Sequence, residues 1–117
     1  MAERELLHLV LEDDWVRAQQ VGEIPAHPGP FVHLSTPEQV ALPANRLFAG
    51  RADVLLLRVD PQRLTGEVRW EPGVPGDPES MRFPHLYAPL PVSAVVGVLA
   101  YRPGPDGRFG APEPAEP

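Results

Sequence analysis

The hydrophobic residues of this chain fall into short runs separated by polar, proline-rich and glycine-rich stretches. Residues 6–11 form an apolar run with one histidine, and residues 54–59 form the most uniform apolar run in the chain. Continuous apolar runs of this length are typical of buried strands. We therefore predict a strand at each position and expect residues 54–59 to be the central one.

Two further segments, residues 31–35 and 83–87, place an aromatic residue, a histidine and a hydroxyl at alternate positions. Because side chains alternate across a strand, each set would share one face of its strand. The residues on these two faces are Phe31, His33 and Ser35 in the first segment, and Phe83, His85 and Tyr87 in the second. Two such faces in one small domain predict a shared pocket.

Signals for a helix follow the first apolar run. Asp13 or Asp14 is a suitable N-cap for a short helix that carries Trp15. Gly22 can end this helix because glycine readily adopts the left-handed conformation found after a last turn. The proline and glycine content of residues 22–30 predicts a loop.

A stronger helix signal follows residues 31–35. Thr36 can serve as an N-cap, Pro37 suits the first helical position, and Gln39 completes a capping box. The helix is expected to continue to Gly50. Because proline interrupts the helical hydrogen bonds, Pro43 predicts a kink or a restart within it.

The second half of the chain predicts shorter elements: a turn at 60–64, a strand at 68–71, a loop at 72–82, and a strand after one helical turn within 92–101. Residues 103–117 are mostly proline, glycine and acidic residues, a composition typical of disordered segments. We predict one α+β domain over residues 1–102, with about five or six strands and two helices. A disordered tail is expected to follow it.

The size and composition of the chain are those of a single globular domain. Its 117 residues, 43% of them hydrophobic, are enough to bury a core. The absence of cysteine excludes disulfides, thiolate metal sites and cysteine nucleophiles. No apolar run approaches the roughly 20 residues of a membrane-spanning helix, and the acidic start does not resemble a signal peptide. We therefore expect a cytoplasmic protein.

The charge of the chain argues against two classes of partner. The formal net charge is −6, and all ten cationic residues are arginines. Binding to nucleic acid or to an anionic membrane depends on clustered cations, so we expect neither partner. The absence of lysine also excludes Schiff-base chemistry and a P-loop lysine.

The two histidine segments are the strongest candidates for chemistry. His33 and Ser35 could present an imidazole and a hydroxyl to the same ligand. His85 and Tyr87 repeat the pattern, and Tyr87 could donate to a ligand or stack on a planar ring. The alternative for each segment is structural, with a half-buried histidine donating to a backbone carbonyl and a core tyrosine.

Trp70 and Glu71 place a large ring beside a carboxylate close to the end of a predicted strand. A glutamate there could polarise a hydroxyl or stabilise a cation that develops at an anomeric carbon. The alternative is an exposed carboxylate beside a core tryptophan. His8, within the first apolar run, has the position of a structural residue.

No metal or nucleotide motif accompanies these residues. The histidines lack the spacing of His-Glu-x-x-His, and the chain has no Gly-x-Gly-x-x-Gly fingerprint. We therefore predict no metal site. Any nucleotide would have to be held by arginine side chains and strand-edge groups.

Four segments stand out in order along the chain: Phe-Val-His-Leu-Ser-Thr-Pro-Glu-Gln-Val at 31–40, Leu-Leu-Leu-Arg-Val-Asp at 55–60, Arg-Trp-Glu at 69–71, and Phe-Pro-His-Leu-Tyr-Ala-Pro-Leu at 83–90. Together they resemble a small bacterial family known as domain of unknown function 952. The resemblance runs from about Leu6 to Arg108, which is nearly the whole chain.

The family resemblance implies an ADP-ribosyltransferase-like fold, with split, bent antiparallel or mixed sheets and two short helices. In active members of that superfamily the cleft holds NAD, and a glutamate stabilises the oxocarbenium ion as nicotinamide leaves. The resemblance implies His33, Glu71 and His85 as catalytic residues, although Glu71 lies earlier in the chain than the usual glutamate. The ligand-binding residues that it implies are His8, Ser35, Thr36, Arg58, Arg69, Trp70 and Tyr87.

The leading hypothesis is an enzyme that acts on NAD or a related ADP-ribosyl or nucleotide compound, by glycosidic-bond cleavage or ADP-ribosyl transfer. An alternative on the same fold is a non-catalytic module that binds a nucleotide or another small molecule. A third is RNA phosphate processing by histidines, which the negative charge disfavours. We expect no tightly bound cofactor, NAD as a substrate, and a monomer or a weak homodimer through an uncovered sheet edge.

Overall fold

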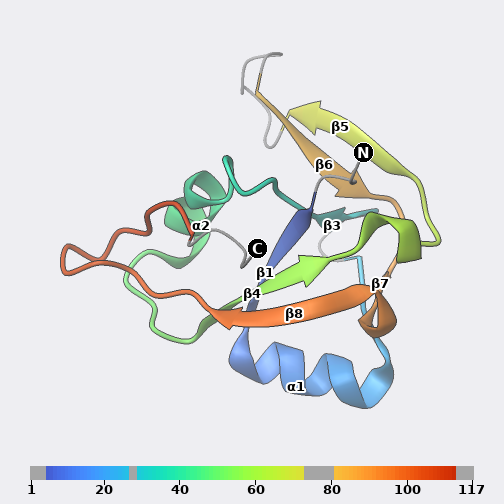
Figure 1. Cartoon of the computed structure of the whole chain (residues 1–117), viewed down its shortest axis with the longest axis horizontal. Coiled ribbons are helices and arrows are strands. Elements are labelled where there is room, and N and C mark those ends of the chain that lie inside the picture. The colour runs from blue at the N-terminus through green and yellow to red at the C-terminus, as the bar shows by residue number, and fades with distance from the viewer. Residues whose placement is uncertain (1–4, 27–28, 73–80, 113–117) are drawn as a thin grey trace.

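The computed structural model describes residues 5–26, 29–72 and 81–112, and they form an α+β fold with antiparallel strand pairing (Figure 1). The helices are α1 (Glu12–Val21) and α2 (Ala41–Phe48), with one-turn 3₁₀ helices at Pro61–Arg63 and Val92–Ala94. The strands are β1 (Leu6–Leu11), β2 (Glu23–Ile24), β3 (Val32–His33), β4 (Val54–Val59), β5 (Val68–Pro72), β6 (Arg82–Leu86), β7 (Leu90–Pro91) and β8 (Val95–Ala100). The predicted α+β class is confirmed.

The strands form three small sheets, with the orders β1-β4-β8, β2-β7 and β3-β6-β5. The first and third sheets meet where Ser35 forms an isolated antiparallel bridge with Leu7 of β1. We call this junction the crease. Both backbone hydrogen bonds of this bridge are 2.8 Å long. In addition, the Leu34 N–H donates to the Pro84 carbonyl in β6. The segment after β3 thus borders both sheets, and the histidine of β3 lies beside the crease.

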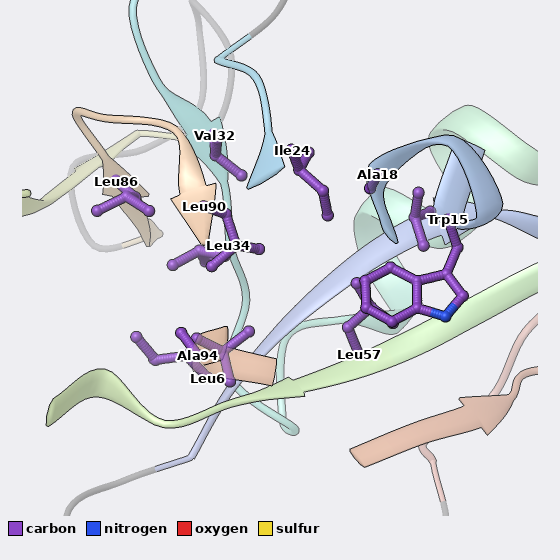
Figure 2. Packing of buried hydrophobic residues seen from close by; sticks show 12 residues of the cluster. Leu6, Trp15, Ala18, Ile24, Val32, Leu34, Leu57, Leu86, Leu90 and Ala94 are labelled. Carbon is purple, nitrogen blue, oxygen red and sulfur yellow. The ribbon is translucent and has the colours of Figure 1, made fainter. Parts of the chain in front are cut away.

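Strand β4 is central in its sheet, as predicted, and is buried on both faces. Leu57 belongs to one core cluster and Leu56 to another, because successive side chains of a strand point in opposite directions. Figure 2 shows the first cluster, in which Trp15 and Ala18 of α1 pack near Leu57. The uniform apolar run at 54–59 therefore reflects two cores rather than one.

Helix α1 begins one to two residues before the predicted cap. Its N-cap is Leu11, which makes no side-chain capping hydrogen bond. The first turn is acidic instead, with Glu12, Asp13 and Asp14, and these negative charges interact favourably with the positive end of the helix dipole. The C-terminal end is as predicted: Gly22 has φ 101°, and its N–H donates to the Ala18 carbonyl.

Helix α2 starts later than predicted. The Thr36 N–H donates to Gln39 Oε1 at 3.1 Å, as in a capping box, but residues 37–40 form turns and the helix begins at Ala41. Pro43 therefore falls in the first turn of α2, where the missing N–H would have no helical partner. The expected kink at this proline is wrong for that reason.

The segment after β8 departs from the prediction of a disordered tail. Phe109 is buried against Tyr101, with ring centroids 4.8 Å apart. Asn45 of α2 binds this segment twice, accepting from the Phe109 N–H at 2.8 Å and donating to its carbonyl at 3.0 Å. Phe109 therefore anchors this segment on the core cluster that contains Leu56, and residues 113–117 lie outside the described residues.

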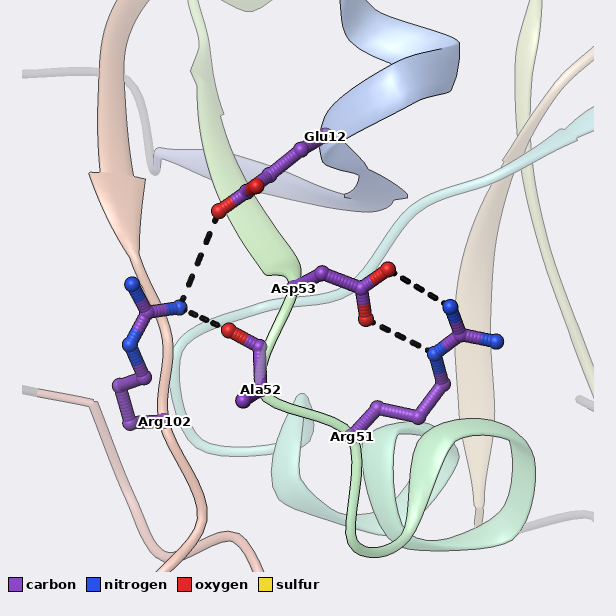
Figure 3. A network of polar contacts seen from close by, with 5 residues as sticks. All are labelled: Glu12, Arg51, Ala52, Asp53 and Arg102. Atoms are coloured by element: carbon purple, nitrogen blue, oxygen red, sulfur yellow. Dashed lines mark hydrogen bonds and ion pairs between the residues drawn. The ribbon is translucent and has the colours of Figure 1, made fainter.

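A polar network fixes the chain where β1 and β8 end and β4 begins (Figure 3). The Arg51 guanidinium and the Asp53 carboxylate form two hydrogen bonds, the longer of them 2.8 Å. Arg102 donates to the Ala52 carbonyl and lies 4.0 Å from Glu12. These contacts tie the segment before β4 to the end of β8 and the start of α1. Within the described part of the chain, no helix is long and apolar enough to cross a membrane.

Candidate functional site

The β3-β6-β5 sheet places three candidate side chains in one row across its strands. His33 of β3 pairs with His85 of β6, and His85 pairs with Arg69 of β5. Residues paired in register point to the same face of a sheet. Glu71 lies two residues beyond Arg69 and Tyr87 two residues beyond His85, so alternation places them on this face as well.

Glu71 lies at the centre of this cluster. Its Oε1 accepts a hydrogen bond from the Tyr87 hydroxyl at 2.6 Å and one from His85 Nδ1 at 2.9 Å. These hydrogen bonds, from Tyr87 first and His85 second, lower the pKa of Glu71 below its usual value. The carboxylate is therefore ionised at neutral pH. It faces the other site residues rather than standing alone in solvent.

Tyr87 is held from two sides. Its hydrogen bond to Glu71 raises the pKa of its phenol, because the anionic acceptor favours the protonated hydroxyl. The guanidinium of Arg69 lies over the tyrosine ring, with Cζ 4.3 Å from the ring centroid. A cation over an aromatic face is attracted by the ring quadrupole, so this contact helps to orient the tyrosine.

His85 is buried beneath an aromatic ring. Only 1% of the residue is exposed, and the Phe31 ring stacks on it with centroids 4.0 Å apart and an interplanar angle of 8°. The Phe31 ring is also 5.1 Å from that of Tyr87. Within the described residues, His85 Nε2 has no hydrogen-bond partner. The imidazole is thus fixed by one nitrogen and unsatisfied at the other.

His33 is the exposed member of the histidine pair. Its ring meets His85 edge-on at 5.1 Å and Phe31 edge-on at 4.8 Å. Partial desolvation lowers the pKa of His33, and the electrostatic interaction with the neighbouring His85 lowers it further. His33 is therefore unprotonated at neutral pH, as a general base has to be.

A groove of about 790 Å³ runs from His33 along β1 to both helices. Its walls are mainly apolar, and its rim carries Arg17 of α1 and Arg46 of α2. The volume lies within the range of small-molecule sites. His33, Ser35 and Phe83 line the groove, whereas His85, Tyr87 and Glu71 do not. The predicted pocket shared by both histidine segments is therefore formed only in part, and His33 is the residue that joins the groove to the aromatic cluster.

His8 and Ser35 line this groove together with His33. The family resemblance had also grouped these three as site residues. His8 Nδ1 donates to the His33 carbonyl at 2.8 Å, which links β1 to β3. Burial lowers the pKa of His8 more than this hydrogen bond raises it. Ser35 is buried and its backbone bridges to Leu7. Both residues thus shape the groove wall and contribute to the crease.

Three other candidate residues lie apart from the cluster. Arg58 of β4 is bound to Glu5, and its side chain passes over Gly97 of β8. Trp70 points to the opposite face from Arg69 and Glu71 and is 42% exposed. Thr36 is buried at the turn before α2. The structure therefore does not bring Arg58, Trp70 or Thr36 to the His33–Glu71–His85 cluster.

Sequence reasoning missed the stacking role of Phe31 and the contribution of the two helices. The alternation of Phe31 with His33 was a usable signal for the first. For the second, Leu47 of α2 is 67% exposed and lines the groove. The sequence alone does not show that an apolar helix residue lines a groove, because packing in the core would account for the same residue equally well.

In the described segments, no three His, Asp or Glu side chains are placed to hold a metal ion.

Comparison with known proteins places this arrangement in a wider group. A family model described as a protein of unknown function (DUF952) matches residues 9–98. The crystal structure of protein CC0527 from Caulobacter crescentus is similar, with a TM-score of 0.77 and 30% sequence identity, over 91% of this chain and 93% of that chain. Its solution NMR structure gives a TM-score of 0.75 and 30% identity, over 90% of each chain. No curated protein matches the chain. The similarity covers nearly the whole of both chains, so the fold is common to them.

Proposed function

This chain belongs to the DUF952 family, and we propose that it acts on NAD or a related ADP-ribosyl compound bound in the groove beside His33. The observation that carries the proposal is the position of the Glu71 carboxylate. It is held ionised by Tyr87 and His85, and His85 in turn contacts His33, which lines a ligand-sized groove. An anion and a base on one face of a sheet, beside a groove, are the groups that glycosidic-bond cleavage requires.

The proposed reaction is hydrolysis of the bond between nicotinamide and ribose. Nicotinamide leaves with the bonding electron pair, and a positive charge develops on the ribose ring. The ionised Glu71 stabilises that charge. A water molecule then forms the new bond to the anomeric carbon and loses its proton to His33, giving ADP-ribose. An acceptor hydroxyl in place of water would give ADP-ribosyl transfer by the same steps.

The groove supplies features that suit the rest of such a compound. Its apolar walls, which include Leu11, Ile24 and Phe48, can cover a planar base. Arg17 and Arg46 among its lining residues provide positive charge for a pyrophosphate, although both also have partners within the protein, which for Arg17 is Asp14 at 2.9 Å. Arg58, a ligand-binding candidate from the family resemblance, is bound to Glu5 and does not line the groove.

The arrangement of the sheets offers support by analogy. Two small antiparallel sheets meet at the crease beside β3, and the groove lies there. A split, bent pair of sheets with a cleft is what the ADP-ribosyltransferase-like resemblance implies. Because one fold can host many unrelated functions, the support for the reaction comes mainly from the site residues.

A second candidate is a non-catalytic module that binds the same class of compound. It is favoured by one observation: Glu71 Oε1 already accepts two hydrogen bonds. Each donor disperses part of the negative charge that a developing cation would use. In this case the cluster would hold a ligand group without splitting the glycosidic bond.

The test is incubation of the pure protein with NAD, with free nicotinamide followed by chromatography. We expect release by the wild type and loss of release in His33→Ala and Glu71→Gln. Trp70→Ala is the matched control, because this exposed residue lies on the opposite face of the same strand as Glu71. Thermal stabilisation by NAD without nicotinamide release would favour the binding module. Release that persists in both site variants would refute the proposed mechanism.

A further inference from the structure

The groove beside His33 follows the edge of β1 rather than one of its faces. Leu9, Val10 and Leu11 all line it, although their side chains alternate between the two core clusters. Three consecutive residues of one strand can line the same groove where the edge of the strand faces it. β1 is also the outermost strand of its sheet, and within the described residues its outer edge is paired by the single bridge at Leu7.

The bridge at Leu7 shows which backbone groups of β1 point into the groove. The N–H and C=O of Leu7 both bond to Ser35, on the side away from β4. Because these groups alternate along a strand, the N–H and C=O of Leu9 and the N–H of Leu11 also point away from β4. In the described part of the chain, these three groups have no backbone partner on that side. An unpaired strand edge of this kind is a template for another strand.

The pairing of β1 with the segment at β3 ends where a side chain replaces the next backbone donor. Two residues on from the bridge between Leu7 and Ser35, a continued ladder would have the Leu9 N–H donating to the His33 carbonyl. That carbonyl instead accepts a hydrogen bond from His8 Nδ1 at 2.8 Å. β3 pairs with β6 on its other side, so the two segments diverge and the groove opens between them.

The walls on either side of this edge are apolar. Ala18 and Val21 line the groove from α1, and Leu47 and Phe48 line it from α2. Val21 is 68% exposed and Leu47 is 67% exposed, the two highest values among the large hydrophobic residues of the described chain. Apolar surface is therefore left uncovered on both helices beside the unpaired edge. The charged residues that line the groove are balanced in sign: Asp14, Glu23, Arg17 and Arg46.

We propose that the groove binds an extended, uncharged peptide segment of a partner protein, which adds to the edge of β1 as a fourth strand of its sheet. The peptide backbone pairs with Leu9 and Leu11, because an extended backbone carries N–H and C=O groups at the spacing that this edge requires. Its side chains alternate between the α1 wall and the α2 wall, so apolar residues are required at consecutive positions. The balanced charges of the lining favour neither an acidic nor a basic peptide.

This binding goes beyond the proposed function and does not depend on it. The apolar walls that would cover a nucleotide base are the walls that would hold the peptide, so the two ligands exclude each other. The peptide would therefore inhibit the proposed reaction competitively. Only this regulatory consequence rests on the proposed function.

Amide hydrogen exchange followed by NMR tests whether the edge is open. In the free protein, the amides of His8 and Val10 face β4 and should exchange slowly. The amides of Leu9 and Leu11 should exchange at least about tenfold faster than these two. A slowly exchanging Leu9 amide in the free protein would mean that the edge is already paired, and it would overturn the proposal.

The peptide is obtained by selection from a displayed library of random heptapeptides, and an enriched sequence is synthesised with blocked ends. Bound in the absence of NAD, it should slow exchange of the Leu9 and Leu11 amides at least about tenfold. Leu47→Asp puts a charge in the α2 wall and should weaken the affinity, measured by calorimetry, at least about tenfold. Leu99→Asp is the matched control, because Leu99 is 44% exposed on β8 and does not line the groove. This variant should bind like the wild type.

The proposal is overturned if no library peptide is enriched, if the bound peptide leaves the Leu9 amide unprotected, or if the two aspartate variants bind alike. It is also overturned if the free protein is a dimer that Leu47→Asp dissociates, since a second copy would then fill the groove. Because NAD takes no part in these measurements, a lack of nicotinamide release would refute the proposed reaction alone.

Discussion

Glu71 Oε1 accepts a hydrogen bond from Nδ1 of His85 at 2.9 Å, across the antiparallel pair formed by β5 and β6. This contact makes His85 Nδ1 the hydrogen-bond donor of a buried imidazole, and, after the hydrogen bond from Tyr87, it is the second cause of the lowered pKa of Glu71. It also ties two chemical groups of the site to a rigid strand pair rather than to a loop. Such positioning by paired strands is what holds a functional constellation in place.

The pKa of Tyr87 reports directly on Glu71. The anionic carboxylate raises the pKa of the phenol, so Glu71→Gln should bring this pKa down towards its usual value. Ultraviolet absorbance of tyrosinate during a pH titration measures it. The chain has two tyrosines, so both proteins should carry Tyr101→Phe, which leaves Tyr87 as the only signal. An unchanged pKa in the glutamine variant would contradict the hydrogen bond.

Stability should fall as the solution is acidified through the histidine range. Burial lowers the pKa values of His8 and His33 below 6.5 in the folded protein. The unfolded chain therefore binds protons more readily just below that pH, so acidification favours unfolding, while above it these groups contribute no slope. The pKa of Glu71 is lowered from 4.5, so its own contribution is lost only in more acidic solution.

Urea unfolding at a series of pH values measures this slope. His8→Gln, which can still donate a hydrogen bond to the His33 carbonyl, should reduce the loss of unfolding free energy between about pH 7 and pH 5. A variant with the same slope as the wild type would show that His8 does not titrate differently in the folded protein.

The segment after β8 should contribute substantially to stability. Phe109 is only 4% exposed and packs against Tyr101, so Phe109→Ala should lower the free energy of unfolding by about 3–5 kcal/mol. Arg108→Ala, an exposed neighbour, is the control and should change it little. If the two variants were equally stable, Phe109 would contribute no packing energy, and the segment would be disordered, as its composition predicts.

The parts of the fold that the sequence predicts well are those in which one local signal decides. The strands predicted at 6–11 and 54–59 have the observed bounds, because each is a continuous apolar run of strand length. Gly22 ends α1, as its left-handed conformation predicts. The start of α2 was misplaced because Thr36 and Gln39 form their capping contact around a turn rather than a helix. Local signals cannot distinguish these two outcomes.

The site was predictable only in part, because its geometry depends on contacts between distant segments. Alternation places His33 and His85 on faces of their strands, but only the register of β3 against β6 places them opposite each other. Composition hid the role of Phe109, since one aromatic residue in a proline-rich segment gives no periodic signal. Likewise, nothing in the sequence around Arg58 shows that Glu5 binds it.

The central claim is that the His33–Glu71–His85 cluster, together with the adjoining groove, forms one ligand site. The most direct measurement is NMR of the histidine ring nitrogens during titration with NAD, because the chain has only four histidines to assign. We expect saturable shifts of the His33 and His85 signals, while backbone signals of β8 stay unchanged. If millimolar NAD left both rings unshifted, or moved only signals far from the crease, the account of this site would be contradicted.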